Sequence, residues 1–139
     1  QKTKLVIRIV NEGGFRMSLR GVDLSALLLI ESDLRQATLI NANLAFSILT
    51  GSDLSGSILQ QANLRQTDLS RVNLSQAVLS GADLSNALLI DADLSNADLS
   101  FANLRNTDLT GANLFETNLE NAVFDNTRMP DGTIRFSRP

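Results

Sequence analysis

Leucine recurs at every fifth position along most of the chain. Reading from Leu19, each fifth residue is leucine up to Leu119, and Phe124, Met129 and Ile134 continue the same register. The residue two positions before each leucine is usually small, and the residue between the two is most often aspartate or asparagine. A period of five fits neither a helix of about 3.6 residues per turn nor a long flat strand of period two. The chain is therefore an array of five-residue units.

Each unit combines a short extended segment with a corner. The small residue and the central leucine lie two positions apart, so both point to one side of the segment, and the outward residue between them points to the other side. Two corner residues follow the leucine, often serine and then glycine or asparagine. Glycine and asparagine tolerate the positive φ that tight turns require. Repetition of an extended segment and a corner closes the chain into a coil.

The pattern strongly resembles the pentapeptide-repeat family, whose motif is written A(D/N)LXX. The resemblance covers residues 17–131 in more than twenty consecutive units. It implies an all-β fold, a right-handed quadrilateral β-helix with four units, or about 20 residues, per coil. The segment Thr127–Thr133 also resembles the end of many cyanobacterial and plastid members. That likeness suggests a photosynthetic source and a location in the cytoplasm or the thylakoid lumen.

Three segments follow from the extent of the repeat. We expect residues 1–16 to form an N-terminal cap, either a strand or a short helix, residues 17–131 to form the β-helix, and residues 132–139 to form a C-terminal cap or tail. Phe136 is expected to cover the apolar core at that end. The predicted core is a stack of central leucines: Leu24, Leu29, Leu34, Leu39, Leu44, Leu49, Leu54, Leu59, Leu64, Leu69, Leu74, Leu79, Leu84, Leu89, Leu94, Leu99, Leu104, Leu109, Leu114 and Leu119.

The composition argues against catalysis and metal binding. The chain has no cysteine and no histidine, which removes thiolate and imidazole chemistry. Asp33 and Asp53 would be like charges in adjacent coils, which costs stability, and single carboxylates do not supply the six to eight oxygens that calcium takes. We therefore predict no catalytic residue, no metal site, no cofactor and no enzymatic activity. No apolar run reaches the roughly 18 residues of a membrane span.

The outward residues supply the candidate interaction surface. Apolar residues replace aspartate and asparagine on two opposite faces, and such exposed clusters mark protein contacts. The alternative is that β-branched residues there only stiffen a strand. Phe46, Phe101 and Phe115 at the corners are either binding anchors or lids over neighbouring coils. The candidate surface comprises Leu28, Ile30, Ile48, Leu88 and Ile90 on one face and Ile58 and Val78 on the other.

These features predict a non-enzymatic structural module that binds an unidentified protein partner. We expect a monomer, with dimerisation through an apolar face as the alternative, and no contact with a membrane. The net charge is −3, with the bases concentrated before residue 22, so the acidic body is not expected to bind nucleic acid. The alternative function is a DNA mimic acting on a type II topoisomerase, as the resemblance allows. The modest charge and the absence of a C-terminal helix weaken it.

Overall fold

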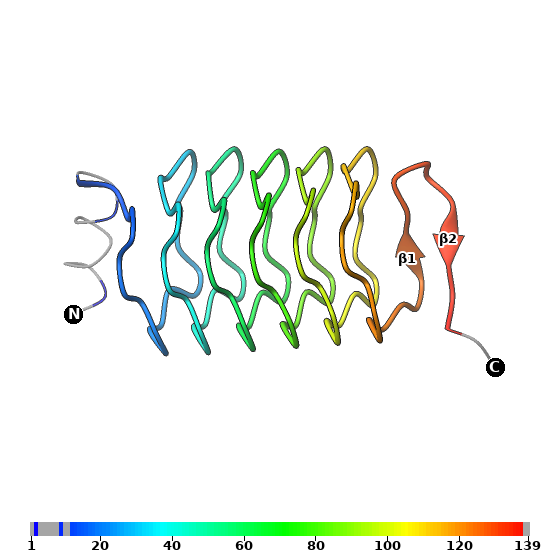
Figure 1. The fold of residues 1–139 in the computed structure, drawn as a ribbon, viewed down its shortest axis with the longest axis horizontal. Helices are drawn as coiled ribbons and strands as arrows, with labels where there is room; N and C mark the ends of the chain where they lie inside the picture. Colours follow the sequence, from blue (N-terminus) through cyan, green and yellow to red (C-terminus); the bar gives the residue numbers. More distant parts are fainter. Residues whose placement is uncertain (1, 3–8, 10–11, 138–139) are drawn as a thin grey trace.

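The computed structural model describes residues 2, 9 and 12–137, and the chain forms a right-handed quadrilateral β-helix, which confirms the predicted fold class (Figure 1). Parallel β-bridges join residues twenty positions apart, from Ser18↔Thr38 at one end to Asp108↔Arg128 at the other. One coil therefore takes four five-residue units. The coils stack along the long axis as separate loops of the ribbon (Figure 1).

The stacked units form four faces, which we name by their central residues. The central leucines of the units, every fifth residue from Leu19 to Leu109, are buried and form one continuous apolar core. Leu114 and Leu119 are only partly buried, because no described residue stacks on them. Face A holds Leu24, Leu44, Leu64, Leu84, Leu104 and Phe124; face B holds Leu29, Leu49, Leu69, Leu89, Leu109 and Met129; face C holds Leu34, Leu54, Leu74, Leu94 and Leu114; face D holds Leu39, Leu59, Leu79, Leu99 and Leu119.

The five backbone N–H groups of a unit have fixed destinations, which the unit Ala42–Phe46 illustrates. Ala42 donates within the turn to Leu39 at 3.0 Å, and Asn43 donates to the preceding coil at 2.9 Å. Leu44 and Phe46 both donate to the next coil, at 2.8 and 3.0 Å. Only the first corner residue, Ala45, lacks a backbone acceptor. Each inner coil is therefore bonded to both neighbours, with two donors per unit directed forward and one directed back.

The outward aspartate or asparagine satisfies the remaining N–H group. In Ala42–Phe46 the Oδ1 atom of Asn43 accepts from the backbone of Ala45 at 3.1 Å. All fourteen outward aspartates and asparagines between residues 23 and 118 make this bond. The expectation that these side chains only face solvent was incomplete. Their oxygen closes the corner, because an extended main chain that turns sharply leaves one donor free.

The second corner residue is left-handed in every unit. From Arg16 to Asn126 each fifth residue has a φ between 49° and 70°. Glycine or asparagine was expected there, and the structure also places Gln61, Phe46 and Arg71 in this conformation. Side chains other than glycine and asparagine pay roughly 1 kcal/mol or more for it, which the bonds to both neighbouring coils offset.

The N-terminal segment closes the first coil. Lys2, Ile9 and Glu12, which the structure describes in this segment, are helical, and the side chain of Ile9 is buried in the core. Gly14 has no room for a side chain, since a Cβ atom there would meet Leu34. The other residues of the predicted cap before position 12 lie outside the described residues.

A two-stranded hairpin lies at the C-terminal end. Strand β1 (Thr127–Arg128) pairs antiparallel with β2 (Ile134–Arg135), and β2 lies beyond β1 at the end of the rod (Figure 1). Phe136 covers the core less than expected: it lines a hollow beside Phe124, but 64% of it remains exposed. Arg135 contacts the core residue directly, with its guanidinium carbon 3.7 Å from the centre of the Phe124 ring. The hairpin reverses the chain, so the tail returns over face B toward face A.

Candidate interaction surface

The N-terminal part of face B and its two corners carry an apolar patch, which we define as Leu28, Ile30, Phe46 and Ile48. Leu28 and Ile48 are paired neighbours in adjacent coils. Leu28 is 67% exposed, Ile30 54% and Phe46 59%, whereas Ile48 is half-buried. Phe46 lies two residues before Ile48, at the corner that leads onto face B. Flat strands and tight corners hold these side chains on the outside, so folding of this chain does not bury them.

The remaining residues of the predicted surface lie apart from this patch. Asp68 stands between Ile48 and Leu88 in the face B ladder. Leu88 is 41% exposed and the adjacent Ile90 is half-buried, so this pair forms a smaller separate site. Ile58 and Val78 are paired neighbours on face D, and both are half-buried. The structure thus divides the predicted residues among three places.

The corner phenylalanines also lie apart. Phe46 joins the apolar patch, whereas Phe101 and Phe115 are each 65% exposed at other corners of the rod. All three are too exposed to act as lids over neighbouring coils, which was one of the two interpretations of the sequence. Of these three residues, Phe46 alone extends the predicted surface, because its unit is adjacent to Leu28 and Ile48.

Apolar outward residues leave a backbone donor unsatisfied within the chain. Units with Leu28 or Leu88 have no side-chain acceptor at the outward position, and no described group accepts from the N–H of Ile30 or Ile90. Such donors require water or a partner. Sequence reasoning missed this second property of the patch, although the replacement of aspartate or asparagine by leucine was the signal that could have revealed it.

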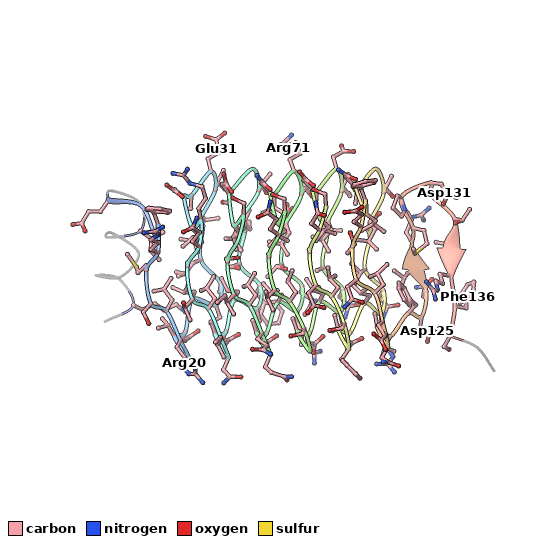
Figure 2. The ribbon with its side chains drawn as sticks, viewed as in Figure 1. Arg20, Glu31, Arg71, Asp125, Asp131 and Phe136 are labelled. Carbon is pink, nitrogen blue, oxygen red and sulfur yellow. The ribbon has the colours of Figure 1, made fainter. Side chains whose placement is uncertain are left out.

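Acidic groups border the apolar patch. Glu31 follows Ile30 at the corner between faces B and C, and Figure 2 shows Glu31, Arg71 and Asp131 along the same edge of the rod. In the described part of the chain, neither Glu31 nor Asp68 forms an ion pair. The patch therefore combines exposed apolar side chains with two neighbouring carboxylates that form no ion pair within the described residues.

Asp33 is a neighbouring carboxylate whose charge is compensated. Its two oxygens accept from the Arg35 guanidinium at 2.8 Å each, and this hydrogen bonding lowers the pKa of Asp33 below its ordinary value. The pKa of Arg35 is raised, first by the hydrogen bond to Asp33, with a smaller contribution from the charge of Asp53. The repulsion expected between Asp33 and Asp53, which are paired neighbours, is therefore offset by Arg35.

A second group of shifted carboxylates lies outside the patch. The pKa of Asp23 is lowered, mainly by the hydroxyl of Ser25 at 2.6 Å, with Lys2 contributing from 3.5 Å. The Thr133 hydroxyl lowers the pKa of Asp131 in the same way. These bonds are of the same kind as the side-chain hydrogen bonds at the other corners, which join an aspartate to the residue two positions after it. Among the described residues, no group of three acidic, histidine or cysteine side chains is arranged to hold a metal ion, and no helix has the length and hydropathy needed to span a membrane.

Comparison with known proteins places these features in a family. The family model described as pentapeptide repeats matches residues 18–56, 57–96 and 92–129. No curated protein sequence matches the chain. Among solved structures, the pentapeptide repeat protein Rfr23 from the cyanobacterium Cyanothece 51142 is similar, with 33% identity, a TM-score of 0.78, and 88% of this chain and 94% of that chain covered.

Two further structures are similar to different degrees. HetL, a pentapeptide repeat protein involved in the regulation of heterocyst differentiation in the cyanobacterium Nostoc sp. strain PCC 7120, shares 32% identity with a TM-score of 0.62, over 86% of this chain and 67% of that chain. QnrB1, a plasmid-mediated fluoroquinolone resistance protein, shares 14% identity with a TM-score of 0.44, over 83% of this chain and 68% of that chain. With the family model matching most of its length, the chain belongs to the pentapeptide-repeat family.

Proposed function

We propose that the protein is a non-enzymatic interaction module that binds a protein partner through the apolar patch on face B. The observation that carries this proposal is the exposure of Leu28, Ile30 and Phe46 on one side of the β-helix. A continuous core and bonds between all coils fix the surface in advance, so binding costs little ordering of the module. Repeat rods of this kind serve as extended binding surfaces.

The border of the patch indicates the chemistry of the partner. Exposed leucine, isoleucine and phenylalanine side chains gain from burial against apolar groups, by about 25 cal/mol per Å² removed from water. Glu31 and Asp68 carry negative charge beside them. A partner with apolar residues flanked by lysine or arginine satisfies both features, and the free N–H of Ile30 adds one site for a carbonyl group.

The test is affinity capture from the source organism with matched variants. The patch variant carries Leu28→Asn and Ile48→Asn, which removes the apolar groups and supplies the corner acceptor that the other units have. The control carries Ile58→Asn and Val78→Asn, the same change on the opposite face. We expect one partner to be retained by wild type and control and lost by the patch variant. Equal retention by both variants, or no reproducible partner, would contradict the proposal.

The topoisomerase alternative has no specific observation in its favour. The similarity to QnrB1 is too low in identity and in TM-score to carry an argument. The net charge of −3 is also modest for a DNA mimic. In a gyrase supercoiling assay we expect neither inhibition nor protection from a fluoroquinolone, and either effect would favour this alternative over the interaction module.

A further inference from the structure

The described residues cover the C-terminal end of the rod on only two of its four faces. Strand β2 pairs with β1 on face B, and Phe136 and Ser137 lie over the face A residues Ala122–Phe124, where these residues line an open hollow of about 630 Å³. On faces C and D the last described units are residues 112–116 and 117–121. We call these ten residues the open step. Leu114 and Leu119 there are partly buried, whereas Leu94 and Leu99 one coil earlier are completely buried.

In the open step, the backbone groups that would bond to a following coil have no partner among the described residues. One coil earlier, four N–H groups donate forward to the step, at 2.8–2.9 Å: those of Leu94, Asn96, Leu99 and Phe101. Two carbonyl groups there, of Ala92 and Ala97, each accept from it at 2.9 Å. In the step itself no described group pairs with the corresponding N–H groups of Leu114, Glu116, Leu119 and Asn121 or the carbonyl groups of Ala112 and Thr117.

We propose that the open step binds an extended segment of a partner protein, which adds to faces C and D as one further half-coil. Addition of a strand to an open edge is a general mode of peptide recognition, in which main-chain hydrogen bonds supply affinity. The segment must offer four acceptors and two donors over ten residues, and it must bend in the middle as the corner does. Apolar side chains five residues apart would cover Leu114 and Leu119.

Charge specifies the segment further. Glu116 and Glu120 are exposed in the step, and no ion pair involves either of them within the described residues. A segment with arginine or lysine beside its apolar residues therefore fits better than an acidic one. The chain's own residues 62–71, Ala-Asn-Leu-Arg-Gln-Thr-Asp-Leu-Ser-Arg, have these properties and form a suitable probe peptide.

A second copy of the chain fits the step less well. The complementary edge is the start of the β-helix, where the side chain of Ile9 is buried in the core and the N–H of Gly13 donates to the carbonyl of Ile9 at 3.1 Å, so the chain itself covers this end. If two C-terminal ends met, each open step would present four N–H donors to only two carbonyl acceptors of the other. These two facts favour a separate extended segment over self-association.

The experiment measures binding of the fluorescein-labelled probe peptide by anisotropy, with two backbone-methylated versions. In the rod the N–H of Asn63 points to the preceding coil and that of Leu64 to the next coil. Methylation at the asparagine of the peptide therefore removes a bond to the step, and we expect at least about tenfold weaker binding. The N–H of the following leucine points away from the step, so methylation there should change the dissociation constant by less than about twofold.

Protein variants locate the site. Glu116→Arg is an exposed change that should weaken binding of the peptide by about tenfold and leave the melting temperature unaltered. The patch variant with Leu28→Asn and Ile48→Asn should bind the peptide as the wild type does, so this result is independent of the proposed function. The proposal is overturned by absence of saturable binding up to about 1 mM peptide, or by equal binding of the two methylated peptides. A dimer in sedimentation velocity that Glu116→Arg abolishes also overturns it.

Discussion

Replacement of Asp68 tests whether the outward carboxylate or amide holds each corner together. The Oδ1 atom of Asp68 accepts from the backbone N–H of Ser70 at 3.0 Å, and both residues are half-buried. Alanine removes this acceptor, whereas asparagine keeps an oxygen at the same position. A net hydrogen bond contributes about 0.5–1.5 kcal/mol, and water reaches Ser70 only in part. We expect Asp68→Ala to lower the free energy of unfolding by about 1 kcal/mol and Asp68→Asn to lower it by less than about 0.5 kcal/mol.

The reverse change offers an independent check at Leu88. This residue is exposed, and the N–H of Ile90 that follows has no acceptor among the described groups. Leu88→Asn supplies one, so we expect stability to rise by about 0.5–1 kcal/mol. Leu88→Ala is the matched control and should not raise it.

The assay is equilibrium urea unfolding followed by far-ultraviolet circular dichroism, with thermal melting as a second measure. A loss of about 1 kcal/mol corresponds to a fall of about 3–5 °C in the melting temperature of a domain of this size. The reasoning is refuted if Asp68→Ala and Asp68→Asn unfold at the same urea concentration, or if Leu88→Asn is no more stable than Leu88→Ala.

Three further predictions concern the core, a buried hydroxyl and the response to acid. Leu64→Ala should cost about 2–5 kcal/mol and Leu119→Ala clearly less, because Leu64 is fully buried and Leu119 only partly; equal costs in urea unfolding would contradict the assigned burial. The hydroxyl of Ser57 is buried without a partner among the described residues, so Ser57→Ala should raise stability by up to about 1 kcal/mol, and a loss in thermal melting would show a hidden bond. Hydrogen bonding to Arg35 lowers the pKa of Asp33, so its contribution is present above the unfolded pKa and is lost as pH falls through the folded pKa. The difference in stability between wild type and Asp33→Asn should accordingly shrink below about pH 4. A difference that does not change with pH would show that the carboxylate is not its source.

Periodicity allowed the path of the chain to be predicted, because a strict repeat makes every unit solve the same packing problem. One register of leucines was enough to place the core and the outward residues. The outward position itself was misjudged in one respect. Composition shows that aspartate and asparagine prefer it, but whether their oxygen faces water or the N–H of a residue such as Ser70 depends on how tightly the corner turns.

Surface features depended more on contacts between coils. The pairing of Leu28 with Ile48 followed from the twenty-residue coil, and so did the interruption by Asp68. The C-terminal end could not be predicted in the same way. Ile134 keeps the five-residue register, yet the hairpin of β1 and β2 takes it out of the face C stack and leaves Leu114 without a covering side chain. A register describes the repeat and carries no information on where a turn ends it.

The uniform bonding of consecutive coils has a consequence for how such chains can change in length. Bridges always join residues twenty apart, so insertion or deletion of twenty residues lengthens or shortens the rod and leaves each side facing the same way. A five-residue insertion keeps the core equally well, because one unit replaces another. It rotates every later residue by a quarter turn, however, and moves whatever the downstream sides present to a different direction in space.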